Sequence, residues 1–414
     1  MAYCIPFVIQ SFEMNFFTSP TLLLINPLSD LKALIYSIKD IAMRVGVFFI
    51  FSLFLVCFGC PNIKSPTTVH ETADRALLPL VRKHQLVGAV VGVVAGENQS
   101  VFVYGETTLG TGQKPDINTV YEIGSISKVF TGILLAALAH DGLVTYDDPV
   151  ENLLPKSVKM PNFQGQSITL THLATHTAGL PRLPDNLSPA DPDNPYADYS
   201  DSLMFDFLTG YTLPRAPGSL YEYSNLGAGL LGYALALQAG LTYEKTLRKY
   251  VLDLLNLQDT TITLSADQRE RLAPGYISKH FGPIPLKPSV TSNWDFDVLV
   301  GAGGIRSTMK DMMLFLNANL NPQGPLADTL NDAQQPRKEI IENVQIGLFW
   351  HISYDDKWDG PLVWHNGETG GYHSFICFSR TYGIGVVILA NTVSSAVDQA
   401  GMAIFEAARF LPLE

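Results

Sequence analysis

The sequence predicts an α/β protein in which both ends of the chain build one antiparallel sheet, flanked by helices, while a mostly helical insertion domain fills the middle. Strand patterns occur shortly after residue 86, and four more follow residue 344. Helical patterns dominate the stretch between them, above all residues 126–138 and 200–256. Strands at both ends with helices between them are typical of a sheet assembled from the two chain termini.

The size and charge of the chain restrict what it can do. With 414 residues and 47% hydrophobic content, it can bury a core large enough for one big or two interleaved domains. The net charge of -12 and the absence of any lysine or arginine run argue against a nucleic-acid surface. The stretch GAGGIRS at 301–307 lacks the lysine and the spacing of a phosphate-binding loop. Small molecules or cell-wall material are therefore the expected partners, and no cofactor is expected.

The amino-terminal region differs from the rest of the chain. Residues 45–59 carry no charge, follow Arg44 and are too few to span a membrane, which is typical of a secretory signal. They end in LVCFGC, which resembles the cleavage box of bacterial lipoproteins, although Cys57 and Phe58 depart from the usual pattern. We expect residues 1–60 to be a lipoprotein signal, with Cys60 lipidated and the rest of the chain exported to the periplasm.

Two alternatives concern this same region. The apolar stretch could be a genuine membrane anchor, and residues 1–42 could be an over-extended start with Met43 as the initiator. A chain that begins at Cys60 would keep only Cys60 and Cys377, so no disulfide framework is implied.

The first predicted elements of the folded domain are a helix and a hairpin. Residues 69–86 follow a polar linker and are predicted to be helical. Residues 87–96 and 100–107 are rich in valine and are joined by the turn GENQ, so they are predicted to be two strands. A buried helix then begins near residue 126, because apolar side chains leave hardly any polar face between Val129 and Leu138.

The remaining elements follow in order. A short helix is predicted to end at Gly179, residues 200–256 are predicted to be largely helical, and an amphipathic helix over 308–320 follows a proline-rich loop. A terminal helix is predicted from about Ala396. Four strands are predicted before it, over residues 345–353, 362–367, 373–379 and 383–390.

The stretch YEIGSISKVF places Lys128 near the start of the buried helix. A buried ammonium needs a counter-charge, or it loses its proton and becomes a base. Ser125 lies three residues earlier, which on a helix puts its hydroxyl on the same face as the amine. A base beside a hydroxyl makes a nucleophile, and a helix amino terminus favours the anion that develops. The alternative is an N-cap serine followed by a lysine that extends its amine to solvent.

A second group lies in APGSLYEYSNLG, just before a predicted helix. Tyr223 and Asn225 flank Ser224, so both side chains can project from one short turn into a cleft. A phenol beside an ammonium is expected to lose its proton more readily, and an asparagine offers both a donor and an acceptor to an amide. The alternative interpretation of this pattern is a helix cap.

A third group lies in WHNGETGGYHSF. His365 ends an apolar strand, and glycines at positions 360, 367, 370 and 371 permit the close approach of a ligand to the backbone. The alternative is a glycine-rich hairpin with a structural histidine.

Together the three groups resemble the active-site motifs of class C β-lactamases and of related penicillin-binding D-alanyl-D-alanine peptidases and serine esterases. YEIGSISK is similar to the signature of that family, and Tyr223-Ser224-Asn225 is similar to its Tyr-x-Asn element. HNGETGGYHSF stands where the family has Lys-Thr-Gly and then a Thr-Gly-Gly-aromatic run. The resemblance covers nearly all of residues 70–412, so it implies the family's fold and one hydrolase domain over residues 61–414.

The resemblance also implies an acyl-transfer site. Ser125 would attack a β-lactam, a D-Ala amide or an ester, with Lys128 and Tyr223 sharing the base and acid work. Asn225 would hold the acyl side chain, and the oxyanion would lie between the N–H groups of Ser125 and Glu368, next to Gly367. The choice among the three substrates stays open at this point.

His365 departs from the family pattern, because it takes the place of the lysine, and Asn366 takes the place of the threonine. A histidine of ordinary pKa, ~6.5, is mostly neutral at pH 7, so recognition of a substrate carboxylate should weaken. In a cleft open to water, that recognition should recover as the pH falls from ~8 toward ~6. Efficient β-lactam hydrolysis is therefore in question, whereas hydrolysis as such is expected to survive.

Other classes fit less well. An α/β-hydrolase needs a Gly-x-Ser-x-Gly elbow, which the chain lacks. A metal site at HLATH would use His172 and His176, but no glutamate stands between them and no third ligand is evident, so helix surface is the preferred interpretation. A lipid-anchored protein that binds peptidoglycan or β-lactams and turns over slowly remains a non-enzymatic alternative.

Overall fold

The computed structural model describes residues 65–281 and 284–414, which include most of the hydrolase domain predicted over residues 61–414. The predicted signal over residues 1–60, with Cys60, lies outside the described residues. Within this part of the chain no single helix is both long and apolar enough to cross a bilayer, and only the bent pair Asn225–Ala239 and Tyr243–Leu252 meets the criteria of length and composition.

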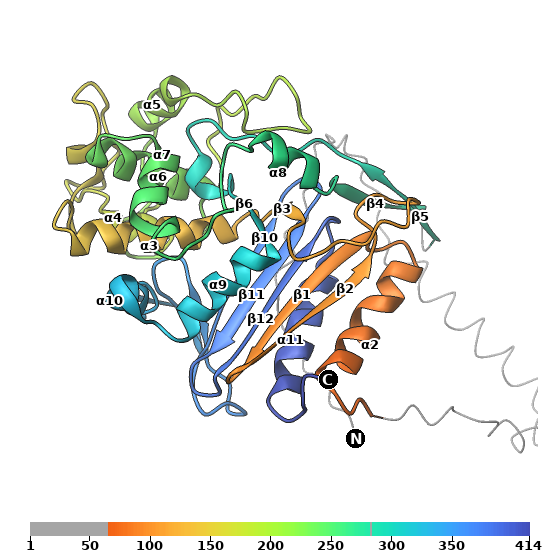
Figure 1. Ribbon diagram of the computed structural model, residues 1–414. Coiled ribbons are helices and arrows are strands. Elements are labelled where there is room, and N and C mark those ends of the chain that lie inside the picture. The colour runs from red at the N-terminus through yellow and green to blue at the C-terminus, as the bar shows by residue number, and fades with distance from the viewer. Residues whose placement is uncertain (1–64, 282–283) are drawn as a thin grey trace, which may run out of the picture. The chain divides into compact units, whose positions relative to one another are not determined.

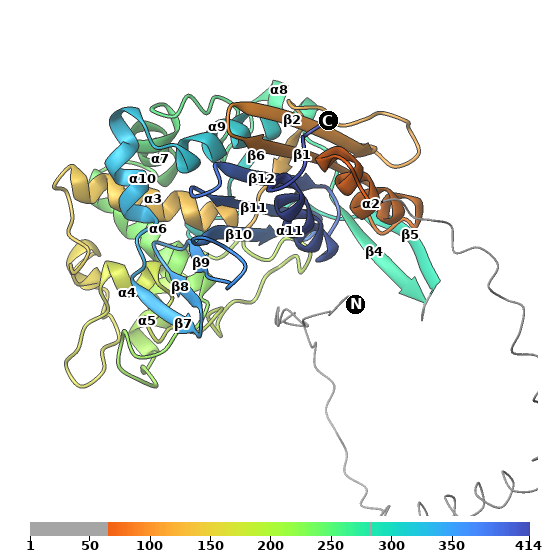
Figure 2. The same cartoon turned by 90° about the horizontal axis from the view of Figure 1, so that it is seen from below.

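An eight-stranded sheet joins the two ends of the domain, in the order β2-β1-β12-β11-β10-β9-β8-β7 (Figures 1 and 2). The hairpin β1 (Gly88–Ala95) and β2 (Asn98–Gly105) comes from the amino-terminal side. It pairs through β1 with β12 (Ile384–Ala390), antiparallel, with Ala89 opposite Ala390. The predicted sheet from both termini is thereby confirmed, and so is the mixed α/β fold class.

Helices cover both faces of this sheet (Figures 1 and 2). The helices α2 (Val69–Arg82) and α11 (Ala396–Ala408) pack against each other on one face, and α9 (Met309–Leu320) packs on the other. Along β1, Ala89, Val91 and Val93 pack into the core beneath α2 and α11, whereas Val90 and Val94 pack into the core beneath α9. Because both faces are covered, the strand is apolar throughout instead of alternating.

The carboxyl-terminal strands are β10 (Leu362–Glu368), β11 (His373–Ser379) and β12, as predicted within a residue or two. The prediction of one strand over residues 345–353 is wrong. Two short strands, β8 (Val344–Ile346) and β9 (His351–Ser353), flank a reversal at Phe349, whose φ of +65° is incompatible with extended backbone. The outermost strand is β7 (Lys338–Ile341).

The helical insertion contains the predicted buried helix α3 (Ile126–His140), whose residues from Ile126 to Leu138 are all buried. Its other helices are α4 (Leu170–Ala174), α5 (Asp201–Gly210), α6 (Asn225–Ala239), α7 (Tyr243–Leu247) with a π-helical turn over Arg248–Leu252, and α10 (Ala327–Ala333). The predicted helical stretch 200–256 is thus interrupted, because residues 211–224 form a loop. Helix α4 also ends five residues before Gly179, and α2 ends at Arg82 instead of residue 86.

The region predicted as a proline-rich loop contains structure that the sequence patterns do not indicate. It holds the hairpin β4 (Tyr276–Phe281) and β5 (Ile284–Val290), the short helix α8 (Ala266–Arg271) and the strand β6 (Arg306–Thr308). Three-residue β3 (Val120–Glu122) pairs with β6 in a separate two-stranded sheet, with Glu122 opposite Arg306. This small sheet holds the backbone that leads into α3, and single-turn 3-10 helices occur at Val150–Leu153, Val300–Ala302 and Gly324–Leu326.

Candidate active site

Ser125 is the N-cap residue of α3, but its hydroxyl caps no backbone amide. Its φ and ψ of -65° and -9° are helical, whereas a capping side chain requires extended backbone. Gly124 before it adopts a φ of +49°, which turns the chain sharply into the helix. The interpretation of Ser125 as an ordinary cap is therefore wrong, and its hydroxyl is available to Lys128.

Lys128 is completely buried, so the alternative in which its amine extends to solvent is wrong as well. Its Nζ lies 2.9 Å from Oγ of Ser125 and donates to the carbonyl of Ala302 at 2.7 Å. Among the residues that the structure describes, no carboxylate forms an ion pair with it. Burial, and next the charge of Arg182, hold the pKa of Lys128 well below its usual value, which favours the neutral amine.

Tyr223 stands at the end of the loop before α6, with its ring over the same amine. Nζ of Lys128 lies 4.8 Å from the ring centroid, and the ring of His176 is 4.4 Å away, centroid to centroid. Burial raises the pKa of Tyr223 to about 12, although a hydrogen bond with Ser125 and the charge of Arg182 oppose the rise. The expected easier loss of the phenolic proton is therefore not found, because burial outweighs the charge of Arg182 and because Lys128 favours its neutral form.

Asn225 begins α6 beside Tyr223 and is partly exposed. Its Nδ2 donates to the hydroxyl of Tyr196 at 3.0 Å, while Oδ1 accepts no hydrogen bond within the described part of the chain. Ser224 supplies the cap of the helix, since its hydroxyl accepts the N–H of Gly227 at 2.8 Å. The cap and the candidate binding residue are thus two different side chains, and Asn225 keeps an acceptor for a ligand.

His176 lies beneath this loop, so its interpretation as helix surface is wrong. It follows α4, has a φ of +56° and is 1% exposed. Its Nδ1 accepts the N–H of Ser224 at 3.1 Å, and its carbonyl accepts the N–H of Glu222 at 2.7 Å. His172 instead bonds the N–H of Thr169 in a capping box. His176 therefore holds the backbone on both sides of Tyr223, a function that the spacing HLATH did not reveal.

The end of β10 crosses the start of α3 at very short range. A Cβ on Gly367 would lie 2.1 Å from the carbonyl oxygen of Ile123 and 2.9 Å from the amide nitrogen of Ser125. A Cβ on Gly124 would lie 2.5 Å from the amide nitrogen of Glu368. Only glycines fit both positions, and their contact brings the amides of Ser125 and Glu368 to one place. At Gly367 the sequence predicted the close approach of a ligand, whereas the structure shows the close approach of the backbone around Gly124.

His365 departs most from what the sequence indicates. Its side chain is 1% exposed, its Nδ1 lies 2.5 Å from the carbonyl of Asn366, and its Nε2 has no hydrogen-bond partner in the described residues. Its ring lies 5.2 Å from that of His351. Burial, followed by the charges of His351 and Lys128, holds the pKa of His365 well below its usual value. The expected ordinary pKa in an open cleft is therefore wrong.

A charged cluster that the sequence analysis missed lies on the other face of β10 and β11. His373 is 3% exposed, with Nε2 2.7 Å from Oδ1 of Asp398 and Nδ1 3.3 Å from Oε2 of Glu368. The second oxygen of Asp398 accepts Nδ2 of Asn366 at 2.8 Å. Burial alone would lower the pKa of His373, but bonding to Asp398 and Glu368 outweighs it and raises the pKa to about 9. The cluster holds residues on both sides of Gly367.

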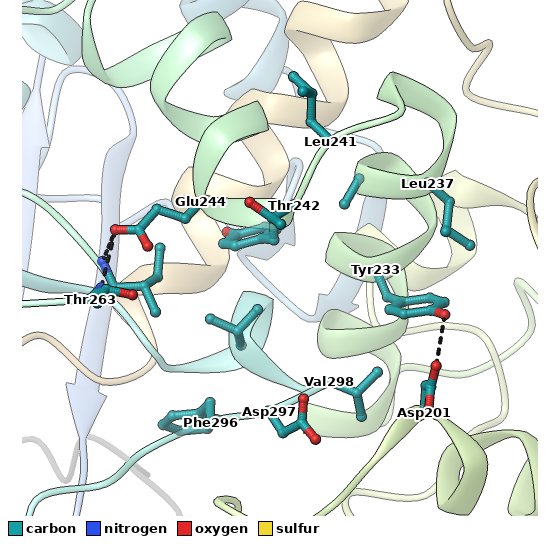
Figure 3. A pocket seen from close by; sticks show the side chains of 14 residues that line it. Asp201, Tyr233, Leu237, Leu241, Thr242, Glu244, Thr263, Phe296, Asp297 and Val298 are labelled. Atoms are coloured by element: carbon teal, nitrogen blue, oxygen red, sulfur yellow. Dashed lines mark hydrogen bonds between the residues drawn. The ribbon is translucent and has the colours of Figure 1, made fainter.

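A cavity of about 590 Å³ lies apart from these residues, beside α6 and α7 (Figure 3). Asp201, Tyr233, Phe296 and Asp297 are among its lining side chains, and no predicted site residue is. Glu244 points toward the backbone amides of Ile262 and Thr263, which it binds. In the described residues no group of three histidine, cysteine, aspartate or glutamate side chains could hold a metal ion. The cavity is therefore separate from the candidate active site around Ser125.

Comparisons with known proteins agree with this geometry. The family model described as Beta-lactamase matches residues 73–409. The chain is 27% identical to a "Beta-lactamase" from Yersinia enterocolitica, with 78% of this chain and 87% of that one covered. It is also 27% identical to "D-alanyl-D-alanine-carboxypeptidase/endopeptidase AmpH" of Escherichia coli (strain K12), with 80% and 86% covered.

A solved structure supports the fold. The "Beta-lactamase/D-alanine Carboxypeptidase from Yersinia pestis complexed with citrate" superimposes with a TM-score of 0.70 at 24% sequence identity, covering 82% of this chain and 98% of that one. The resemblance drawn from the three sequence motifs is confirmed by the match over residues 73–409. The chain is a serine hydrolase and belongs to the Beta-lactamase family.

Proposed function

We propose that Ser125 is the nucleophile of this hydrolase and that it opens a β-lactam or a D-alanine-type amide through an acyl-enzyme. The observation that carries the proposal is the contact between Lys128 and Ser125. A buried amine whose pKa is held well below its usual value lies 2.9 Å from a hydroxyl that caps nothing. A neutral amine at this distance accepts the hydroxyl proton as Oγ attacks the carbonyl carbon.

Tyr223 acts with Lys128 in the proton transfers. A phenol with a pKa of about 12 keeps its proton at neutral pH, so it serves as a donor and relay to the leaving nitrogen and not as the initial base. The proton that Lys128 receives from Ser125 then leaves on that nitrogen as the C–N bond breaks. In the second half, water attacks the ester carbonyl, its proton returns through the same groups, and Oγ of Ser125 departs protonated.

The amides of Ser125 and Glu368 bind the oxyanion that forms in both halves. The proposal is supported by the crossing of Gly124 and Gly367, which brings the two N–H groups to one place. Such donors typically contribute ~3 kcal/mol each to the transition state. Asn225 holds the amide of the acyl side chain, because its Oδ1 is a buried acceptor that lacks a partner among the described residues.

The substrate class follows from the relatives and from His365. The names of the relatives point to β-lactams and to D-alanine peptides, and an ester is the alternative. His365 still lines the site in this proposal, but as a neutral imidazole that contributes no full charge to a substrate carboxylate. A D-alanine peptidase with weak β-lactamase activity agrees best with both observations.

The test is covalent labelling of the Ser125→Ala variant with a fluorescent penicillin and with a fluorophosphonate. We expect labelling of the wild type and none of the variant, with unchanged circular dichroism. Labelling that persists in the variant would remove Ser125 from the mechanism. Steady-state rates on nitrocefin, a D-Ala-D-Ala peptide and p-nitrophenyl butyrate rank the substrates, whereas a burst of label without turnover on any of them would favour the non-catalytic binding protein.

We further propose that the chain is exported and lipidated at Cys60, on the sequence pattern described above. Expressed in a Gram-negative host, the protein should incorporate labelled palmitate, and the Cys60→Ser variant should lose it. Equal uptake by the variant, or a mature chain that keeps residues before Cys60, would favour the membrane anchor instead.

A further inference from the structure

Arg182 is exposed to solvent and lies beside Tyr223. Its carbonyl accepts the N–H groups of Asn225 at 3.0 Å and Leu226 at 3.3 Å, so its backbone is fixed to the start of α6. Its guanidinium carbon lies 5.1 Å from the centroid of the Tyr223 ring. A segment that is distant from Ser125 in the sequence thereby brings a permanent positive charge beside the candidate catalytic residues.

No carboxylate of the described chain compensates this charge. Arg215 pairs with Glu222, and Arg306 pairs with Glu122 and Asp295, but Arg182 forms no ion pair with any described residue. Contact with an aromatic face stabilises an exposed guanidinium only slightly and leaves its donors available. A guanidinium binds carboxylates through two parallel N–H donors, so an uncompensated one beside Tyr223 is suited to an anionic ligand.

The charge acts on the catalytic groups at the same time. Arg182 contributes to the lowered pKa of Lys128 and opposes the raised pKa of Tyr223. Both effects require that the guanidinium lie within electrostatic range of the reacting atoms. An anion bound by Arg182 would therefore lie near the scissile bond and not at a remote surface.

The position of Arg182 decides which half of the substrate it contacts. Its backbone is bonded to Asn225, which in the proposed function holds the acyl side chain. We propose that Arg182 binds a carboxylate on the acyl half of the substrate, and that the enzyme therefore prefers acidic acyl groups, such as stem peptides with a free side-chain carboxylate. The inference rests on the proposed function, because it takes the acyl side from the assignment of Asn225.

The experiment compares two esters that differ only in this carboxylate, mono-p-nitrophenyl glutarate and p-nitrophenyl valerate. The ratio of their kcat/KM values is measured for the wild type and for Arg182→Gln, Arg182→Lys and Arg82→Gln. Arg82 is an exposed arginine at the end of α2, on the opposite face of the sheet, so its variant matches the change in net charge. Carbenicillin and benzylpenicillin, which also differ by one acyl-side carboxylate, give the same ratio from acylation rates.

We expect the anionic-to-neutral ratio to fall about tenfold in Arg182→Gln and less in Arg182→Lys. The anionic-to-neutral ratio should be the same in Arg82→Gln as in the wild type. In the wild type, this ratio should decrease as the salt concentration is raised. An unchanged ratio in Arg182→Gln, or an equal fall in Arg82→Gln, would overturn the inference. So would an equal loss on both esters, because Arg182 would then act only through Lys128. Ester hydrolysis that survives Ser125→Ala would instead reject the proposed function, whatever the ratio.

Discussion

His365 and His373 lie on neighbouring strands and are almost equally buried, yet their pKa values move in opposite directions. His365 faces Lys128 and His351, and its pKa is held well below the ordinary value. His373 faces two carboxylates, and its pKa rises to about 9. Burial disfavours the charged imidazole in both places, so the difference comes from the partners, Asp398 above all.

The two histidines show how the candidate base Lys128 is kept uncharged on one face of the strands while the charged pair of His373 and Asp398 holds the strands on the other face. Lys128 shares the environment of His365, with no paired carboxylate in the described residues, and so favours the neutral amine. Asp398 holds Asn366 and His373 on the far face of the same strands. The sheet thereby separates an uncharged face, with the candidate catalytic residues, from a charged face around His373 and Asp398, and each face can be tested by a separate substitution.

The largest effect on activity is expected when the buried amine of Lys128 is removed. Lys128→Met should lower kcat/KM about 10³-fold, because general base catalysis typically contributes 10²–10⁴. The free energy of unfolding should not decrease, because a buried amine without a carboxylate gives way to an apolar side chain of similar length. Steady-state rates and urea unfolding measure both, with Lys310→Met on exposed α9 surface as the matched control. Activity within tenfold of the wild type would contradict the assignment of the base.

The Asp398→Asn substitution should remove the ion pair between Asp398 and His373. His373 then keeps only the more exposed Glu368, 3.3 Å from its Nδ1, and its pKa falls toward the ordinary value. The free energy of unfolding should drop by about 3–5 kcal/mol at pH 7. Glu406→Gln on the same helix is the control, since its pair with Arg409 is partly exposed and should contribute less than about 1 kcal/mol. An equal decrease of the unfolding free energy in the two variants would show that the buried pair of Asp398 and His373 stabilises the fold no more than the partly exposed pair of Glu406 and Arg409.

The pH dependence of stability sharpens the same contrast. The pKa of His373 is about 9 in the folded protein, against an ordinary value of 6.5, so the folded state holds the extra proton between these two values. Its stabilisation is complete below pH ~6.5 and is lost as the pH rises through about 9, by up to about 3 kcal/mol. The loss between pH 6.5 and 9.5 should be smaller in His373→Gln, measured by urea unfolding. Parallel profiles for the two proteins would count against a charged His373.

The smallest effect concerns His365. Because its pKa lies well below the usual value, its charge should not change between pH 8 and 6. The anionic-to-neutral ester ratio of the wild type should therefore vary less than twofold in that range, and His365→Gln should show the same flat profile. A ratio that rises severalfold toward pH 6 in the wild type alone would restore the ionisable recognition that the sequence suggested.

Much of the fold was predictable because it depends on patterns within single elements. The valine-rich hairpin, the three carboxyl-terminal strands and the buried helix with Ser125 and Lys128 three residues apart all follow from local periodicity. The pairs β3 with β6 and β4 with β5 were missed, since short strands carry little periodic signal and are stabilised by partners far along the chain.

By itself the sequence determined the family, the nucleophile and base candidates and the two-ended sheet, because residue type and spacing carry that information. The protonation of those groups depended on the tertiary structure. Asp398 stands 25 residues from His373, and Arg182 far from both Ser125 and Asn225, yet each lies against its target in space. Desolvation and charge act through space over a few ångströms, so residues that are far apart in the chain raise the pKa of His373 and lower those of His365 and Lys128.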